Sequence, residues 1–317
     1  MRHVTHSPRP ASSGRTVFSR RRVLVGGLSG AGAALIAGAG GYLLVEAGVL
    51  PGKYRLAGLL GSCGGDPGIP QMTPGPVSTE TFASRYRGRD VEMITMTPPG
   101  EDARLPVAVV LHGAGGSARS AVQLGFPEFL ADAVTRDEAP AVTLVAVDGG
   151  GSTYWHRRAD GDDPIAMILY EVLPRLAGRG HPTGKIGIIG WSMGGYGALL
   201  LAERLGPGRV AAVAASSPAV FASYQAARAA NRDAFDSAAD FAANDVTSHT
   251  GSGLATLRRL PVMIDCGSDD PFGPQDSALR DQLGDPPGAI SSGCHDAAFW
   301  RRHLPAQLAF LGTHLSR

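Results

Sequence analysis

Short apolar runs rich in β-branched residues recur along the chain after residue 77 and alternate with stretches of helical periodicity. Runs that are apolar throughout are typical of parallel strands that are buried on both faces. The pattern therefore predicts an α/β domain with a mostly parallel central sheet and helices on both faces. The predicted strands cover residues 91–97, 107–112, 142–147, 186–190, 210–215 and 262–266, and the predicted helices cover residues 122–135, 165–176, 194–205, 275–283 and 297–315.

The N-terminal part has the layout of an export signal. Residues 1–22 contain six arginines and no acidic residue, and residues 23–45 carry no charge. The segment Ser19-Arg20-Arg21-Arg22-Val23-Leu24 resembles the twin-arginine signal, which sends folded proteins across the bacterial inner membrane. We therefore expect residues 1–50 to be a signal or membrane anchor that the twin-arginine export machinery recognises, with the protein exported to the extracellular space or cell envelope.

Three fates of the leader remain open. The uncharged run of 23 residues is long enough to span a bilayer and anchor the protein if it is retained. Ala37-Gly38-Ala39 offers a cleavage site instead, and Leu60-Gly61-Ser62-Cys63 resembles a lipidation motif, although an ordinary thiol is the preferred interpretation of Cys63. Residues 51–76 are dense in Gly and Pro, which predicts a linker before a catalytic domain at residues 77–317.

Charge and metal-ligand spacing argue against two classes of function. The formal net charge is only +1, so the chain lacks the basic excess that gathers phosphates, and no nucleic acid partner is expected. Cys63, Cys266 and Cys294 match no zinc-finger spacing, and none of the nine histidines forms a His-Glu-x-x-His stretch. We therefore expect neither a metal nor an organic cofactor.

The candidate nucleophile is Ser192, in Gly190-Trp191-Ser192-Met193-Gly194 between a predicted strand and a predicted helix. A nucleophile elbow holds its serine in a strained conformation and needs small residues two positions to either side, a demand that Gly190 and Gly194 meet. The alternative is a glycine-rich turn with an idle serine.

Leu111-His112-Gly113-Ala114-Gly115-Gly116 ends an early predicted strand, where this kind of site draws a backbone donor. We expect the N–H groups of Ala114 and Met193 to form the oxyanion hole. His112 is interpreted as a structural hydrogen-bonding residue beneath this loop.

A serine nucleophile of this kind needs a histidine as general base and an acidic residue that orients the histidine. Both are expected after late strands, in the chain order Ser, acid, His. Asp269 and Asp270 both follow the strand at residues 262–266, and His295 precedes the last helix. Because Cys266 and Cys294 each stand next to one of these turns, they either form a disulfide or remain two buried thiols.

Taken together, these motifs resemble the "Putative esterase" family, which includes esterase D, S-formylglutathione hydrolases, feruloyl esterases and mycolyltransferases. The resemblance covers residues 77–315 and implies an α/β-hydrolase fold with little or no separate lid domain. Because the acid of that family precedes a Pro-Phe-like pair, here Pro271-Phe272, the resemblance implies a triad of Ser192, Asp270 and His295. The leader and the Ala, Gly and Arg content suggest an actinobacterial source.

The expected activity is hydrolysis of a small-molecule, lipid or sugar ester through an acyl-serine intermediate. One alternative is an acyltransferase that passes the acyl group to a sugar or lipid hydroxyl, and another is a catalytically inactive cell-wall binding protein. The loop at residues 148–156 matches the acceptor pocket of neither the S-formylglutathione hydrolases nor the mycolyltransferases. By position, Tyr154 and Trp155 form an apolar pocket wall together with Trp191, or else an aromatic plug over the sheet end.

Overall fold

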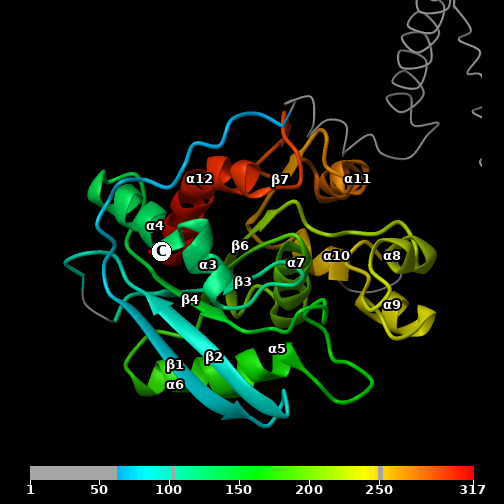
Figure 1. Ribbon diagram of the computed structural model, residues 1–317, viewed down its shortest axis with the longest axis horizontal. Helices are drawn as coiled ribbons and strands as arrows, with labels where there is room; N and C mark the ends of the chain where they lie inside the picture. The colour runs from blue at the N-terminus through cyan, green and yellow to red at the C-terminus, as the bar shows by residue number, and fades with distance from the viewer. Residues whose placement is uncertain (1–62, 102–103, 249–252) are drawn as a thin grey trace, which may run out of the picture. The chain divides into compact units, whose positions relative to one another are not determined.

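The computed structural model describes residues 63–101, 104–248 and 253–317 (Figure 1), all of which belong to one compact unit, Tyr54–Arg317. The predicted signal or anchor at residues 1–50 and the first part of the predicted linker lie outside these ranges. Among the described residues, no helix has both the length and the apolar character that a membrane crossing requires.

The described residues form an eight-stranded sheet in the order β1-β2-β4-β3-β5-β6-β7-β8. Strand β2 runs antiparallel to both β1 and β4, and every other neighbouring pair is parallel. Each predicted strand is confirmed within about two residues, an agreement usual for element boundaries. The strands are β1 (Val77–Ser84), β2 (Arg89–Met96), β3 (Val107–Leu111), β4 (Thr143–Val147), β5 (Ile186–Trp191), β6 (Val210–Ser216), β7 (Val262–Gly267) and β8 (Ile290–Ser291).

Helices cover both faces of the sheet, as the apolar runs predict. In β3, Val107, Val109 and Leu111 join the core cluster on one face, and Ala108 and Val110 join the cluster on the other. Figure 1 shows α4 and α12 side by side, and α5 and α6 next to the β1–β2 hairpin. One face carries α3 (Arg119–Leu124), α4 (Phe126–Thr135) and α12 (Ala297–Leu315); the other carries α5 (Pro164–Met167), the π-helix η1 (Ile168–Val172), α6 (Leu173–Gly178), α7 (Met193–Leu205), α10 (Gly253–Leu257) and α11 (Gly273–Leu283).

The predictions miss the elements with the weakest apolar pattern. Strand β1 is an edge strand whose side chains are mostly exposed, and β8 has only two residues. Two further short helices, α8 (Tyr224–Ala230) and α9 (Ala238–Asn244), precede α10 in the segment of the chain that connects β6 to β7. The single helix predicted at residues 122–135 is divided into α3 and α4 by Gly125, which adopts a left-handed conformation with φ of 97°.

Residues 63–76, expected as linker, lie against the domain without regular secondary structure, and we call them the N-terminal strap. The Asp66 carboxylate pairs with the Arg301 guanidinium of α12 at 2.6 Å. Arg302, also on α12, donates a hydrogen bond to the carbonyl oxygen of Gly65 at 2.8 Å. The strap is therefore attached to the C-terminal helix by charged and backbone contacts.

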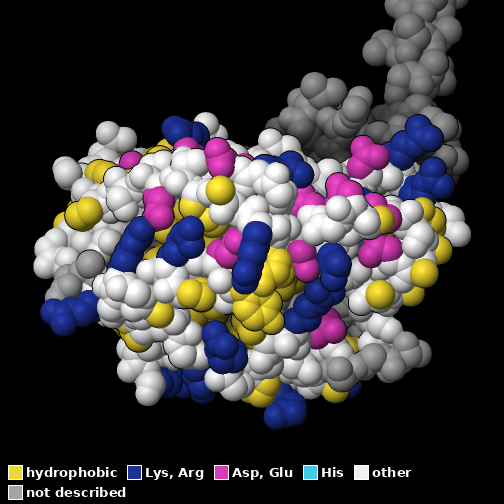
Figure 2. Space-filling view, turned by 90° about the horizontal axis from the view of Figure 1, so that it is seen from below, with side chains coloured by type: hydrophobic (Ala, Val, Ile, Leu, Met, Phe, Trp, Pro, Cys, Tyr) yellow, Lys and Arg dark blue, Asp and Glu magenta, His cyan; other side chains and the backbone are white. Residues whose placement is uncertain are grey.

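Figure 2 views the molecule from below Figure 1, toward the β1–β2 hairpin and α6. Lys and Arg side chains are interspersed with Asp and Glu on this face, without a continuous basic area. Some of these charges are paired: Arg175 and Arg179 both approach the Glu80 carboxylate. Mixed surface charge of this kind favours solubility over attraction to a polyanion.

We expect Gly125→Ala to lower the free energy of unfolding by about 1–3 kcal/mol, because alanine would have to adopt a positive φ that is strained for a residue with a Cβ. That Cβ would also lie 2.9 Å from two carbon atoms of Ile69 in the strap. Gly178 at the end of α6 is a matched control, since its φ is not positive and a Cβ there has open space. Gly178→Ala should raise stability by about 0.4–1 kcal/mol. Urea unfolding measures both, and equal effects would contradict the conformational argument.

Candidate active site

Ser192 lies in the sharp turn between β5 and α7, at the carboxyl edge of the sheet. Its φ of 55° and ψ of −124° are strained for a residue with a side chain. Three hydrogen bonds hold this conformation: Ser192 donates its N–H to Ser216 O at 2.9 Å, and its carbonyl oxygen accepts from the N–H groups of Tyr196 at 3.1 Å and Ala219 at 3.0 Å. The surroundings therefore fix the strained backbone and present the hydroxyl.

Both glycines of the elbow are sterically required. A Cβ at Gly190 would collide with the backbone of Gly194, and a Cβ at Gly194 would collide with the carbonyl group of Leu111 in β3. No side chain fits at either position without moving a strand or the helix. The predicted need for small residues on both sides of Ser192 is therefore present in the structure.

His295 and Asp270 complete a hydrogen-bonded chain with Ser192. The Ser192 hydroxyl lies 2.9 Å from Nε2 of His295, and Nδ1 of His295 lies 2.8 Å from Oδ2 of Asp270. Because an ionised carboxylate only accepts, Nδ1 carries the proton and Nε2 is left to accept from the serine. Phe272 and Trp300 hold the imidazole between them, each with its ring centroid 5.2 Å away.

Of the two aspartates left open by the sequence, the structure places Asp270 beside His295. Its side chain is fully buried, and its second oxygen, Oδ1, accepts the N–H of Phe272 at 2.9 Å. The Asp269 carboxylate instead accepts from the hydroxyl of its neighbour Ser268 at 3.3 Å. The preference for Asp270 that the family resemblance implies therefore agrees with the geometry.

The loop after β3 presents its backbone beside Ser192. Within the described ranges, the N–H groups of Ala114 and Met193 donate to no protein acceptor, which leaves both available to a ligand. A Cβ at Gly113 would lie 3.3 Å from the Ser192 Cβ, so the loop and the nucleophile are in close contact. This arrangement suits an oxyanion hole.

His112 lies under this loop as the sequence analysis anticipates. It is buried, its Nδ1 donates to Gly113 O at 2.8 Å, and its Nε2 accepts the N–H of Gly149 at 3.0 Å. Both ring nitrogens are thus engaged with backbone groups, so the role of His112 is to hold the loop.

An open hollow of about 410 Å³ lies over the nucleophile. Trp191 contributes to its wall as predicted, but Trp300 and Ser120 also line it and were not foreseen as pocket residues. Trp300 belongs to α12, and only the approach of this helix to β5 brings it to the pocket. The lining residues are Gly113, Ala114, Gly115, Gly116, Ser120, Trp191, Ser192, His295 and Trp300.

Tyr154 and Trp155 do not line this hollow, so their assignment as pocket wall is wrong. Both are buried, and both have positive φ, 48° and 60°. A Cβ at Gly197 of α7 would collide with the Trp155 ring, so this glycine makes room for the indole. Burial raises the pKa of Tyr154 to about 12. The alternative, an aromatic plug over the sheet end, is what the structure shows, because the turn directs both rings inward.

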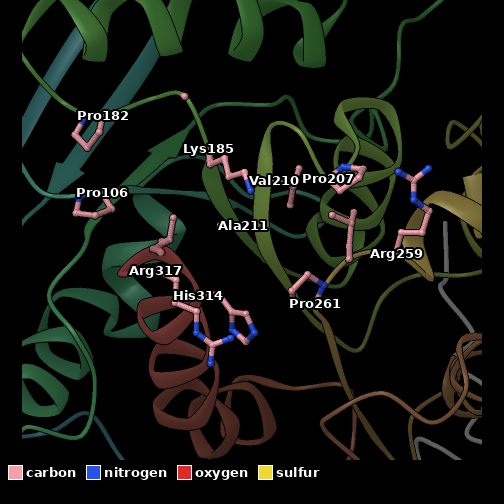
Figure 3. A pocket seen from close by; sticks show the side chains of 13 residues that line it. Pro106, Pro182, Lys185, Pro207, Val210, Ala211, Arg259, Pro261, His314 and Arg317 are labelled. Carbon is pink, nitrogen blue, oxygen red and sulfur yellow. The ribbon is translucent and has the colours of Figure 1, made fainter.

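A larger hollow of about 720 Å³ lies at the opposite, amino edge of the sheet (Figure 3). Pro106, Lys185 and Pro261 line it, each directly before a strand, together with His314 and Arg317 at the C-terminal end. It contains none of the three hydrogen-bonded residues. The volume of a hollow therefore does not identify the candidate active site. The hydrogen-bonded side chains at the carboxyl edge of the sheet do.

Comparisons with known proteins agree with this geometry. Residues 84–283 match the family model described as "Putative esterase". The chain belongs to this esterase family. Members are serine hydrolases, and the order and direction of the strands are those of the α/β-hydrolase fold, so the fold expectation is confirmed. No curated protein matches the chain.

Solved structures share the fold of this hydrolase at low sequence identity. A ferulic acid esterase is 21% identical with a TM-score of 0.62, over 77% of this chain and all of its own. The S-formylglutathione hydrolase of Agrobacterium tumefaciens is 16% identical with a TM-score of 0.60, over 80% of this chain and 100% of its own. MPT51 (FbpC1) of Mycobacterium tuberculosis is 18% identical with a TM-score of 0.56, over 76% of this chain and 99% of its own.

The disulfide of the hydrolase differs from the one considered above. Cys294 is bonded to Cys63 in the strap, so the bridge between Cys266 and Cys294 is not formed and Cys266 is a buried free thiol. The same bond overturns both interpretations of Cys63, as an ordinary thiol and as a lipidation site. The sequence suggested Cys266 as one possible partner because each cysteine stands next to a turn of the predicted site, but the strap brings Cys63 there from outside the sheet.

One group of three potential metal ligands occurs among the described residues, Cys63, Cys294 and Asp296, with its atoms within 4.8 Å of one another. The two cysteines are joined as a disulfide and offer no thiolates, so this donor set does not suit a metal ion.

A second buried carboxyl group lies behind the triad. Asp276 of α11 is fully buried, and neither of its oxygens has an N–H or O–H partner among the described residues. Burial, together with the nearby charge of Asp270, raises the pKa of Asp276 well above its usual value. Burial also raises the pKa of the neighbouring Cys266 thiol. The raised pKa favours the protonated form of the carboxyl group behind Asp270.

We expect Asp276→Asn to stabilise the hydrolase increasingly as the pH rises above about 4. The usual pKa of 3.8 applies to the unfolded chain, and the folded pKa is higher, so the folded state binds more protons between these values. Wild-type stability therefore falls with rising pH through this window, by about 1.4 kcal/mol for each pH unit. Asparagine does not titrate, so the stability of the variant does not fall with rising pH for this reason.

Urea unfolding at pH 4, 6 and 8 measures this difference. Asp281→Asn, an exposed change on the same helix, is the matched control and should show no such growth with pH. A pH-independent difference for Asp276→Asn would contradict a neutral Asp276.

Proposed function

We propose that the chain hydrolyses carboxylic esters through an acyl-serine intermediate. The observation that carries this proposal is the continuous hydrogen-bonded chain from the Ser192 hydroxyl through His295 to Asp270, which opens into a hollow lined by free N–H groups. A buried carboxylate, an oriented imidazole and a hydroxyl in this order are the parts that acyl transfer requires.

In the first step, Nε2 of His295 takes the proton of Ser192 while the hydroxyl oxygen attacks the ester carbonyl carbon. Asp270 keeps the other proton on Nδ1 and stabilises the imidazolium that forms. The N–H groups of Ala114 and Met193 donate to the developing oxyanion, and Met193 begins α7, whose positive dipole end faces the same charge. The carbon–oxygen bond to the alcohol then breaks, and His295 gives its proton to the departing oxygen.

In the second step, water attacks the acyl-serine. His295 accepts one proton of the water, the oxyanion forms again in the same hole, and the acid leaves as Ser192 regains its proton. The side chain of His295 is 24% exposed, so water reaches the base directly. A sugar or lipid hydroxyl in place of this water would turn the same step into acyl transfer.

The balance between hydrolysis and transfer is measurable with a p-nitrophenyl ester, with and without an added alcohol. Hydrolysis predicts free acid as the main product in both mixtures. Ester of the added alcohol as the main product would instead identify an acyltransferase.

We also propose that the protein acts outside the cytoplasm. The disulfide between Cys63 and Cys294 supports this, since such bonds persist in oxidising compartments, and the arginine-rich leader supports it independently. Intact mass of the protein recovered from culture medium and from membranes tests both the location and the fate of the leader.

Ser192→Ala should lower ester turnover by a factor on the order of 10⁴ or more, because the variant lacks the attacking oxygen. A fluorophosphonate probe should label the wild-type protein at Ser192 and leave the variant unlabelled. Folded wild-type protein that takes no label would favour the inactive cell-wall binding protein instead.

Asp270→Asn should lower kcat by a factor on the order of 10⁴, because the amide no longer holds the required tautomer of His295. Asp269→Asn is the matched control and should retain nearly full turnover, since only its backbone N–H contacts the histidine loop. Steady-state kinetics on both proteins compare them, and a larger loss at residue 269 would mean that the acid is misassigned.

A further inference from the structure

The residue directly before His295 is cross-linked to a distant part of the chain. Cys294 is bonded to Cys63, 231 positions earlier, and their Cα atoms lie 4.8 Å apart. His295 occupies the loop between β8 and α12, so its imidazole reaches Ser192 only while this loop keeps its position. The cross-link therefore restrains the chain one peptide bond away from the proposed general base.

Hydrogen bonds hold this loop on either side of the cross-link but not at the histidine. Gly293 O accepts from Asp269 at 2.9 Å, and the Asp296 side chain caps α12 at 2.9 Å. Within the part of the chain that the structure describes, the main-chain groups of Cys294 and His295 make no hydrogen bond of their own. The nearest restraints on the backbone of His295 are thus the disulfide on one side and, on the other, the Asp296 carbonyl, which accepts the N–H of Trp300 at 3.2 Å.

The other end of the cross-link is itself fixed. Arg302 donates to Cys63 O at 3.1 Å and to Gly65 O at 2.8 Å, and Arg301 pairs with Asp66 at 2.6 Å. Both arginines belong to α12, which begins directly after the histidine loop. The strap is therefore held at two places, by the arginines of α12 and by the disulfide to Cys294, and His295 lies in the short segment between Cys294 and α12.

We propose that the Cys63–Cys294 disulfide positions His295 and that full turnover requires this bond. The inference rests on the proposed esterase function, in which Nε2 must stay within hydrogen-bond reach of the Ser192 hydroxyl. The rings of Phe272 and Trp300 restrict the tilt of the imidazole but do not fix its backbone. A displacement of about 1 Å at such a site costs on the order of 10² in rate.

The bond also makes turnover depend on the redox compartment. Its formation oxidises the two thiols, releases two protons and passes two electrons to the disulfide of an oxidising thiol–disulfide oxidoreductase, which becomes a dithiol. A dithiol reductant reverses the step and is itself oxidised to a disulfide. The free Cys266 is buried and its pKa is raised, so it offers little thiolate for exchange with this bond. The enzyme would gain full activity only after reaching an oxidising compartment.

The test compares oxidised, dithiothreitol-treated and reoxidised protein on p-nitrophenyl butyrate. Reduction should lower kcat by about 10- to 100-fold, with KM changed by less than about twofold, since the base moves while the pocket remains. The rate of fluorophosphonate labelling should fall in parallel, and reoxidation should restore both. Near-UV circular dichroism verifies that the reduced protein stays folded, and alkylation followed by mass measurement verifies that the bond is open.

Two variants sharpen the comparison. Cys63→Ser, which lies outside the hollow, should show the low kcat of the reduced protein and no further response to reductant. Cys266→Ala is the matched control and should lose kcat on reduction by the same factor as the parent. If Cys63→Ser does not fold, reduction of the native protein still decides the question.

Reduced, folded protein with the kcat of the oxidised form would overturn the inference, and so would a loss of activity that appears only with unfolding. Oxidised protein that neither turns over an ester nor takes the probe would overturn the proposed function itself. Equal activity in both redox states leaves the esterase proposal intact and removes only the positioning role of the disulfide.

Discussion

The strained turn at Ser192 is the constraint on which the rest of the site depends. Its backbone conformation is tolerated only because neighbouring segments exchange hydrogen bonds with it and because two glycines allow β5, α7 and β3 to approach. The same turn aims the hydroxyl away from the sheet and, among the described residues, leaves the N–H of Met193 unpaired beside it. One local conformation thus supplies both the proposed nucleophile and half of the proposed oxyanion hole.

The parallel sheet turns this local feature into a site. Strands β3, β5 and β7 end at the same edge, so the loops that follow them bring Ala114, Ser192 and Asp270 together although they are far apart in sequence. His295 instead lies in the loop between β8, a strand of only two residues, and α12. This difference explains why the loop of His295, rather than the turn of Ser192, is restrained by a disulfide at Cys294. Two aromatic rings contact the imidazole, and the arginines of α12 bind the strap that carries the other cysteine.

Burial separates the roles of chemically similar groups near the base. Asp270 is fully buried yet bonded to an imidazole and a backbone N–H, so its charge is stabilised where it is needed. Asp276 is equally buried, and burial together with the charge of Asp270 raises its pKa well above the usual value. The two aspartates therefore differ in their partners: Asp270 accepts hydrogen bonds from an imidazole and a backbone N–H, whereas Asp276 in α11 has no N–H or O–H donor among the described residues.

Features that depend on local pattern can be predicted from the amino-acid sequence. The strands from β2 to β7 follow from apolar runs. Ser192 and Asp270 follow from turns after two of these strands and from the family resemblance, and His295 follows from its place before the last predicted helix and from the same resemblance. The tertiary structure alone decided the features that depend on distant contacts. Cys63 reaches Cys294 across 231 positions, Trp300 enters the pocket wall through the approach of α12, and Tyr154 and Trp155 turn inward because Gly197 leaves space. Spacing along a chain predicts which side of an element a residue occupies, but not which distant segment comes to lie against it.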